Sequence, residues 1–402
     1  MKSRLIFLVV ALVAAMMPAG AGASAVAGPT YEIDAIISLT GQAAFIGAQE
    51  SQALQAYETV VNRTGGIHGR PVHFAIDDDQ SNPAIAVQLA NAIIAKNVSV
   101  ILGPDLTATC RAVMPLTTNG PVAYCFSPAI DPERNTYMFS SGPSTQQNIA
   151  ATLRYFSRNR WKRIALIAST DATGQHGTEL VEQTLHQREF ADMTLAAEER
   201  FADGDVSVGA QVARVKAAQP QAIIAWTTGT PTGTVLHGLH DAGLDLPVML
   251  NAGNILRAQL RDYGSFVPSR LTFTGVRFMA SSLVRPGPVS DAQREFADGL
   301  RARGVAPPEI SNDIAWTPAK IVVEALRRLP EHATAADVKN YIEGLHGFAV
   351  PDNLMDFRDG SQRGVPQAAV VIVRWIPLKA GFEPVSQPGG APLPTATDTY
   401  PR

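Results

Sequence analysis

The sequence predicts an α/β protein with two doubly wound parallel sheets, and three observations lead to this fold class. Apolar, β-branched runs alternate with segments of helical periodicity, which is the pattern of β-α-β units. The alternation runs to about Ser141 and restarts at Gln146. In both passes polar loops follow the strands, at the edge where open parallel sheets bind ligands. We therefore expect two similar units, each with a row of strand-end loops.

The first unit combines short strands, bounded by turn residues, with connecting helices. The expected strands are Tyr31–Leu39, Pro71–Ile76, Val98–Leu102, Pro121–Phe126 and Tyr137–Ser141. The expected helices are Ala48–Arg63, Ala84–Lys96 and a segment from near Ala108 to Thr117. Asn82 and Pro83 suit the N-cap and first-turn positions of the second helix.

The second unit repeats the pattern. Its expected strands are Arg163–Ala168, Met193–Arg200, Gln221–Trp226 and Pro247–Leu250. Its expected helices are Gln146–Asn159, Gln175–Glu189, Ser207–Ala218 and Gly233–Ala242. A third portion adds the helices Asp291–Arg303, Ala315–Leu329 and Thr334–Leu345, and then a late strand, Ala368–Val373. The tail, residues 379–402, is rich in Pro and Gly and is expected to be disordered.

The composition limits the class of protein, and the first residues indicate its location in the cell. The chain has 402 residues, 46% apolar and 17% charged, with a net charge of -3, as expected for a globular protein of two or three domains. The spread of Lys and Arg argues against nucleic-acid binding. A basic start at Lys2 and Arg4, a short apolar run and small residues predict a signal peptide over residues 1–23, with cleavage as late as residue 27. We expect a periplasmic protein, with an uncleaved anchor as the alternative.

The stretch from Val98 to Asp131 reads as strand, loop, helix, strand, loop. Parallel strands need such a crossover, so its two polar loops should lie side by side at one sheet edge. Thr107, Thr109 and Ser127 place hydroxyls there, which suit holding a ligand rather than breaking a bond. Cys110 and Cys125 fall near the same edge, and an exported protein permits a disulfide between them. Two separate buried thiols are the alternative.

Enzyme and metal motifs are missing from the sequence. It has no G-x-S-x-G elbow, P-loop, G-x-G-x-x-G after a strand or H-E-x-x-H. The run Asp77-Asp78-Asp79 reads as a solvated turn, and His237 and His240 as surface residues. We expect no catalysis, no cofactor and no metal.

Several pieces in order resemble one family over about Tyr31 to Trp375. They are SLTGQAAFIG, NRTGGIHGRPV, DDDQSNP, ILGP, SPAIDPE, LIASTDATGQHG, HDAGLDLPVM and FRDGSQRG. The chain resembles the periplasmic solute-binding proteins of ABC transporters, of the leucine/isoleucine/valine-binding type. The resemblance implies a type I periplasmic binding protein fold with two lobes, three crossovers and a ligand cleft between the lobes. Lobe 1 would be residues 31–140 plus 277–348, and lobe 2 would be residues 141–276 plus 349–378.

The resemblance also implies a monomer that captures a small carboxylate by hinge closure and delivers it to permease subunits in the inner membrane. The helix starting near Ala108 would present its N-terminus to the ligand carboxylate. The expected ligand-binding residues are Phe45, Asp105, Leu106, Thr107, Thr109, Ser127, Ala129, Ile130, Thr173, Gly229, Thr230 and Asn251.

The ligand class stays open at this point. Amino-acid binders of the family place a Tyr where this chain has Thr173, and an acidic residue near Asn251, to pair the ligand ammonium. Both are absent here. A branched-chain or hydrophobic amino acid and an aromatic acid therefore remain as alternatives. Two other functions stay as alternatives: a ligand sensor that docks a receptor, and an exported enzyme resembling α/β hydrolases.

Overall fold

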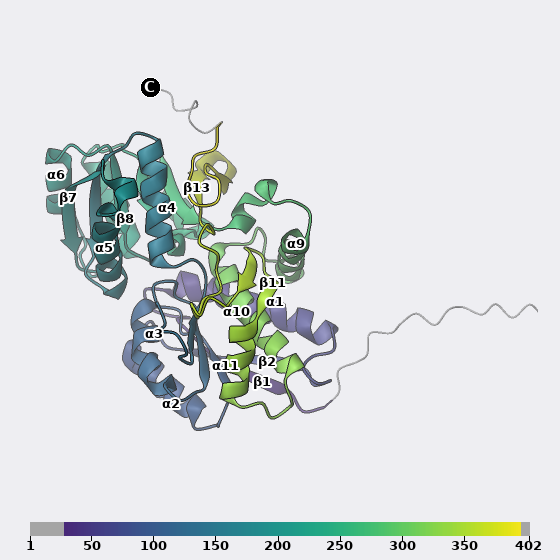
Figure 1. The fold of residues 1–402 in the computed structure, drawn as a ribbon. Helices are drawn as coiled ribbons and strands as arrows, with labels where there is room; N and C mark the ends of the chain where they lie inside the picture. The colour runs from purple at the N-terminus through teal and green to yellow at the C-terminus, as the bar shows by residue number, and fades with distance from the viewer. Residues whose placement is uncertain (1–27, 395–402) are drawn as a thin grey trace, which may run out of the picture.

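The computed structural model describes residues 28–394, which form two α/β halves, each around its own sheet (Figure 1). The first sheet is fully parallel, with the order β2-β1-β3-β4-β5. Its strands are β1 (Tyr31–Ile37), β2 (Val72–Asp78), β3 (Val100–Leu102), β4 (Val122–Cys125) and β5 (Met138–Ser140). The expected signal peptide and residues 395–402 lie outside the described part of the chain.

The second sheet has the order β14-β13-β10-β9-β8-β6-β7. The strands from β10 to β7 pair in parallel, whereas β13 pairs antiparallel with β10 and β14. Its strands are β6 (Arg163–Ser169), β7 (Thr194–Phe201), β8 (Ala222–Trp226), β9 (Val248–Leu250), β10 (Leu271–Gly275), β13 (Val371–Ile376) and β14 (Gly381–Pro384). A separate antiparallel pair joins β11 (His346–Ala349) to β12 (Leu354–Asp356). This architecture confirms the predicted pair of doubly wound sheets.

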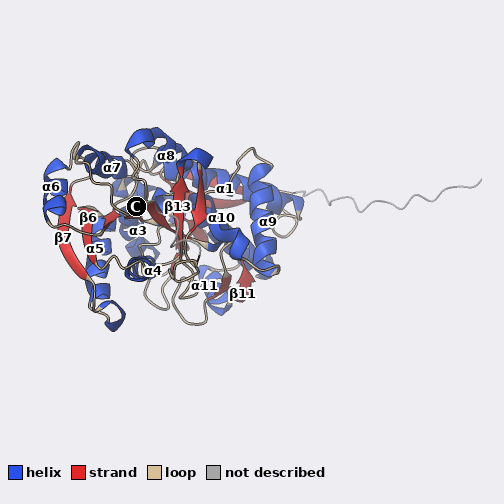
Figure 2. Cartoon of the chain, turned by 90° about the horizontal axis from the view of Figure 1, so that it is seen from above, coloured by secondary structure: helices blue, strands red, loops and turns tan. Residues whose placement is uncertain are grey.

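Helices cover both faces of the sheets, and Figure 2 shows the strands enclosed between them. The first half contains α1 (Ala44–Arg63), α2 (Pro83–Ile94), α3 (Thr107–Val113), α9 (Pro288–Arg301), α10 (Ile310–Arg328) and α11 (Ala335–Gly344). The second half contains α4 (Thr145–Arg158), α5 (Ala172–Leu185), α6 (Gly209–Ala217), α7 (Pro231–Asp241) and α8 (Arg257–Tyr263). Short 3-10 turns are η1 (Met114–Thr117), η2 (Arg188–Phe190), η3 (Ala252–Asn254), η4 (Gly264–Phe266), η5 (Arg277–Leu283) and η6 (Pro377–Lys379).

Strand β1 shows how one sequence serves two cores. Its side chains alternate between the faces of the sheet. Ile36 packs in the cluster formed with α2 and α3. Ala35 and Ile37 pack in the cluster that includes residues of α1 and α10. An apolar residue at every one of these positions therefore indicates a strand buried on both faces.

Helix starts follow capping chemistry that can be read in the sequence. The Asn82 side chain accepts a hydrogen bond from the Ala84 N–H, and Pro83 occupies the first turn of α2, as predicted. The Ser144 side chain likewise accepts a hydrogen bond from the Gln147 N–H at the start of α4. Such caps satisfy N–H groups that have no partner within the helix.

Two expectations about boundaries are wrong. Helix α1 begins at Ala44, not near Ala48, so Phe45 lies in its first turn. The chain after Lys379 is not disordered as far as Leu393, because β14 joins the second sheet and Leu393 N–H bonds the Val385 carbonyl. Apolar contacts explain the ordered tail: the Phe382 ring packs on Trp375 and Phe273. A prediction from the high Pro and Gly content does not take these few packing side chains into account.

The disulfide between Cys110 and Cys125 is present and joins the middle of α3 to the last residue of β4. It therefore fixes α3, which follows the loop after β3, beside the point where the loop after β4 begins. Within residues 28–394, no helix combines the length and the apolar character that a bilayer span requires.

The chain passes from the first sheet to the second after β5, returns after β10, and crosses again between β12 and β13. These three passages connect the two halves.

Candidate ligand-binding site

A cavity of about 60 Å³ lies where the strand-end loops of the two sheets meet. This is the volume open to the centre of a water-sized sphere, and a single water needs on the order of 10–15 Å³ of it, so the cavity suits a small molecule. The first half lines it with Ile46, Glu50, Asp105, Leu106, Thr107, Phe126, Ser127, Pro128, Ala129, Ser311 and Ile314. The second half lines it with Thr145, Asn148, Thr173, Trp226, Thr228, Asn251, Ala252 and Gly253.

Three hydroxyl groups meet at the centre of this arrangement. Thr107 Oγ1 lies 3.0 Å from Ser127 Oγ and 3.1 Å from Thr173 Oγ1. Thr107 starts α3 and Ser127 follows β4 in the first half, whereas Thr173 lies in the first turn of α5 in the second half. The chain therefore brings hydroxyl donors from both halves to one point, where the oxygen atoms of an acid group find partners.

A second polar cluster lies behind the loop after β3. Ser38 N–H donates to Asp105 Oδ2 at 3.0 Å, and Ser38 Oγ lies 2.7 Å from both Asp79 Oδ1 and Asp105 Oδ1. A hydroxyl has one proton to donate, so one of the two carboxyl groups must supply the proton for the other contact. Burial, and then the charge of Asp79, raise the pKa of Asp105 to about 7, which makes Asp105 the protonated member.

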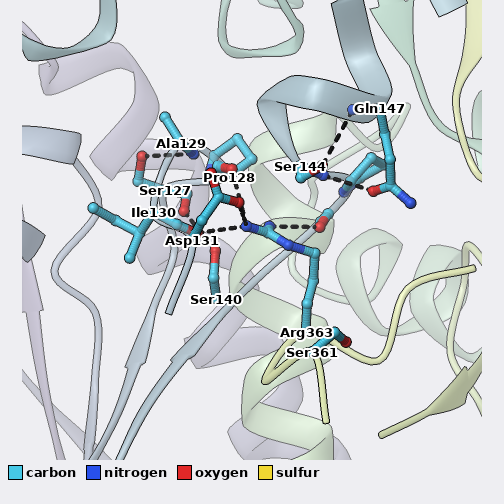
Figure 3. Close-up of polar contacts among 12 residues, drawn as sticks. Ser127, Pro128, Ala129, Ile130, Asp131, Ser140, Ser144, Gln147, Ser361 and Arg363 are labelled. Carbon is cyan, nitrogen blue, oxygen red and sulfur yellow. Dashed lines mark hydrogen bonds and ion pairs between the residues drawn. The ribbon is translucent and has the colours of Figure 1, made fainter. Parts of the chain in front are cut away.

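The loop after β4 is fixed by a guanidinium group from the late part of the chain (Figure 3). The Arg363 side chain, 6% exposed, donates to the carbonyls of Pro128, Ile130, Ser141 and Gly142 and pairs with Asp131. Arg363 thus ties the Ser127–Asp131 loop to the first passage between the sheets. Sequence reasoning missed this role, although Arg363 lies in a piece that carries the family resemblance.

The second half contributes a network that is already satisfied. Asn251 Nδ2 donates to the Thr227 carbonyl at 2.8 Å, and Asn251 Oδ1 accepts from the Gly253 N–H at 3.0 Å. The amide of Asn251 is therefore occupied in shaping η3. Its lining contribution is mainly steric, and Thr228 beside it supplies a further hydroxyl.

Apolar surfaces close the rest of the cavity. Phe126 and Trp226, the residues that follow or end strands β4 and β8, offer aromatic surface, and Ile46 and Ile314 offer aliphatic surface. Within the described chain, three cavity-lining side-chain atoms are buried without a hydrogen-bond partner: Glu50 Oε2, Trp226 Nε1 and Ser311 Oγ. Buried polar atoms are nearly always paired in native proteins, so these atoms mark where a ligand can supply partners.

Most of the expected ligand-binding residues lie on this cavity. They are Asp105, Leu106, Thr107, Ser127, Ala129, Thr173 and Asn251. They come from loops that parallel-sheet topology places together, which is why strand-end reasoning reached them.

Five expected residues lie elsewhere, and two of them miss the cavity because of where their helices begin. The Phe45 ring is 43% exposed on the first turn of α1, and Ile46 takes the position facing the cavity. Thr230 is exposed at the N-cap of α7.

The other three are held by the framework. The Thr109 hydroxyl bonds the backbone of Leu106 at the start of α3, and Ile130 packs in the cluster around the disulfide. Gly229 donates its N–H to Asn254 Oδ1. Its φ is +82°, and a Cβ there would lie 2.9 Å from the Gln42 carbonyl oxygen of the first half. Glycine therefore permits close approach of the two halves at this point.

Some residues that line the cavity were not predicted from the sequence, and they differ in how far the sequence could have indicated their place. Trp226 reads as ordinary core because it ends an apolar run. Glu50 has a usable signal, since it is an acid on the apolar face of a helix, four residues after Ile46 and four before Leu54. Ser311 and Ile314 carry no local signal, because their place depends on how α10 packs on the first half.

Comparisons with known proteins agree on one family. The sequence model of the periplasmic binding protein family matches residues 30–381. The leucine-, isoleucine-, valine-, threonine- and alanine-binding protein of Pseudomonas aeruginosa is 24% identical over 354 residues, 86% of this chain and 90% of that protein. A Leu/Ile/Val-binding protein homologue of Brucella melitensis is 23% identical over 228 residues, 55% of this chain and 61% of that protein.

Solved structures show the same fold. An extracellular ligand-binding receptor from Rhodopseudomonas palustris superposes with a TM-score of 0.79 at 20% identity, covering 88% of this chain and 99% of that one. The branched-chain amino acid transporter substrate-binding protein LivJ of Streptococcus pneumoniae, in complex with isoleucine, gives 0.74 at 17% identity, covering 88% and 98%.

Proposed function

This chain belongs to the periplasmic binding protein family, and from that premise we propose that it is the solute-binding subunit of an ABC importer. It captures a small organic acid between its two halves and releases it unchanged. The observation that carries this proposal is the small cavity whose walls come from strand-end loops of both sheets. A site divided between two bodies suits capture by closure.

The two halves act as hinged lobes in this proposal. Lobe 1 comprises residues 31–140 and 277–356, since β12 pairs with β11, and lobe 2 comprises residues 141–276 together with β13 and β14, so the expected segment 349–378 of lobe 2 shifts at both ends. The contact between Thr107 Oγ1 and Thr173 Oγ1, and the pair of His176 Nε2 with Asp131 Oδ2, each 3.1 Å long, join the lobes beside the cavity. A ligand between the lobes adds contacts that only the closed arrangement offers.

The cavity chemistry defines the solute. The hydroxyls of Thr107, Ser127 and Thr173 suit the oxygens of a carboxylate, and the aliphatic and aromatic walls suit an apolar side chain. The relatives named for leucine, isoleucine and valine favour a hydrophobic amino acid. The rings of Phe126 and Trp226 favour the second candidate class, an aromatic acid.

Its expected address and partners follow from the family. A signal peptide would take the chain to the periplasm, where the loaded protein would dock on permease subunits in the inner membrane. The protein acts as a monomer in this scheme, and neither metal nor cofactor is needed for binding.

A thermal-shift screen tests the proposal. The purified mature protein is heated with hydrophobic amino acids, with aromatic acids and with sugars as controls. A ligand at 100 times its Kd should raise the unfolding free energy by about 2.7 kcal/mol, because it binds only the folded state. Stabilisation by an acid of either class supports the proposal, whereas stabilisation by sugars alone contradicts it.

A further inference from the structure

The cavity wall contributed by α1 holds a buried carboxyl group that the protein leaves partly unpaired. Glu50 is 1% exposed and lines the cavity. Its Oε2 atom has no hydrogen-bond partner among residues 28–394. Leaving a buried acceptor without a partner destabilises the folded protein. This cost is recovered if the partner arrives with the solute.

The charges around Glu50 favour a positive partner. Asp105, which also lines the cavity, lies beside Glu50, and the Asp79 charge acts on it as well. None of the described lining residues is Lys, Arg or His. A positively charged nitrogen entering this corner favours the ionised form of Glu50 and pairs with it, whereas a second carboxylate would be repelled by that form.

This inference rests on the proposed solute-binding function and names the solute class. We propose that Glu50 accepts hydrogen bonds from a positively charged nitrogen of the solute, so that the solute is an amino acid rather than a plain organic acid. The ammonium then lies against α1 of the first half. The carboxylate of the same solute lies against the hydroxyls of Thr107, Ser127 and Thr173.

Binding by this route releases a proton. Burial, and then the neighbouring Asp105 carboxyl, raise the pKa of Glu50 well above its ordinary range, so the group is neutral in the empty protein. When an ammonium binds, the Glu50 proton leaves to solvent and the carboxylate pairs with the ammonium. The facing titratable groups are Asp105 and Asp79; Glu295 of α9 and Glu324 and Arg327 of α10 act instead on Tyr57, further along α1.

The test compares one solute with and without its amine. Isothermal titration of the wild-type protein with L-leucine and with 4-methylpentanoate, its deaminated counterpart, should show preference for leucine of about tenfold to a hundredfold, as expected for hydrogen bonds to a charged group. Glu50→Gln should lower the affinity for leucine by a similar factor and leave the affinity for 4-methylpentanoate unchanged. Leucine titrations in buffers of different ionisation enthalpy should report release of one proton by the wild type and none by the variant.

Glu58→Gln is the matched control, because Glu58 lies on the same helix, bonds the Phe74 N–H and does not line the cavity. It should retain the preference for leucine. Glu50→Gln without ligand should unfold at about the same temperature as wild type, since a neutral amide replaces a neutral carboxyl of similar size at the same position.

Three outcomes would overturn the inference. The wild type could bind both probes with equal affinity, Glu50→Gln could lose binding of both probes, or the unfolding temperature of Glu50→Gln could fall markedly. The last outcome would assign Glu50 a structural role. If neither probe binds the wild type while an aromatic acid does, the inference fails and the solute-binding function stands. If no acid binds at all, the function itself fails.

Discussion

Thr107 is the residue at which the two rows of strand-end loops touch. Replacing it by Val keeps the shape of the side chain and removes the hydroxyl that bridges Ser127 and Thr173. A solute oxygen placed among these hydroxyls then lacks one donor. We expect Thr107→Val to weaken binding of the solute by about 1–3 kcal/mol, as measured by isothermal titration.

A matched control for this variant exists in the second half. Thr178 is also buried, but its hydroxyl bonds the Gly174 carbonyl within α5 and does not line the cavity. Thr178→Val should bind as the wild type does. If both variants bind equally well, the hydroxyl cluster is not the carboxylate site.

Asp105 gives a pH dependence whose sign follows from its environment. The folded protein keeps its proton up to about pH 7, whereas the unfolded chain loses it near the ordinary value of 3.8. Between these values the folded state binds more protons, so this group makes the unfolding free energy fall as pH rises. The fall is at most about 1.4 kcal/mol for each pH unit.

Asp105→Asn removes this dependence and can keep the local geometry. The amide oxygen can accept from the Ser38 N–H, and the amide nitrogen can donate to Ser38 Oγ. Urea unfolding of ligand-free protein at several values between pH 4 and about pH 8 should show a steeper decline for wild type than for the variant. Parallel curves would mean that Asp105 is ionised throughout this range.

At the scale of elements, the disulfide joins helix α3 to the end of strand β4, and the residues that begin α3 and follow β4 line the cavity. It closes a short segment, with a sequence separation of 15 between Cys110 and Cys125. A loop of this length is expected to contribute about 3 kcal/mol to stability. Replacing both residues by Ala should lower the unfolding free energy by about this amount, as measured by denaturant unfolding.

Reduced wild-type protein should match the double variant, because both lack the same cross-link. Thiol titration of the unreduced, unfolded protein should find no free thiol. Detection of two thiols would show that the bridge does not form in the exported protein.

The elements also show what sequence reasoning could reach. Most strands and helices of both sheets were predicted, because β-branched runs such as Arg163–Ser169 and caps such as Asn82 are local signals. Strand β14 was not predicted, because it depends on Phe382 packing against Trp375 and Phe273. Phe273 is far away in the sequence, and a count of Pro and Gly residues does not reveal either contact. Long-range packing is the information that a local pattern lacks.

The same division applies to the candidate site. Thr107 and Ser127 were predicted because they follow neighbouring parallel strands, and topology alone places such loops together. Ser311 and Ile314 arrive on α10, and Arg363 arrives on a late loop, so their positions depend on contacts between distant segments. Phe45 does not line the cavity for a smaller reason: an earlier start of α1 turns Ile46 to the cavity instead.

For the whole molecule, two ion pairs among residues 28–394 join the halves: Arg257 of α8 with Glu309 at the start of α10, which are 15% and 8% exposed, and the more exposed pair of His176 with Asp131. The His176 side chain is 15% exposed and its partner Asp131 is 50% exposed. Such a partly exposed pair contributes at most about 1 kcal/mol. If closure works as we propose, the solute adds contacts to both halves beyond these two pairs, and its presence should favour the closed form.

Small-angle scattering should accordingly show a smaller radius of gyration when a bound amino acid is present than when it is absent. A ligand shifts such an equilibrium only as far as its affinities for the two forms differ, so a solute gripped from both halves is effective. His176→Ala should leave the radius of the ligand-free protein unchanged and weaken binding by no more than about 1 kcal/mol. His237→Ala should change neither, because His237 pairs with Asp241 on its own helix. An unchanged radius of gyration at saturating ligand would mean that the two halves form one rigid body. Because the cavity is lined from both halves, the solute would then have to enter by local opening of a loop rather than by hinge motion.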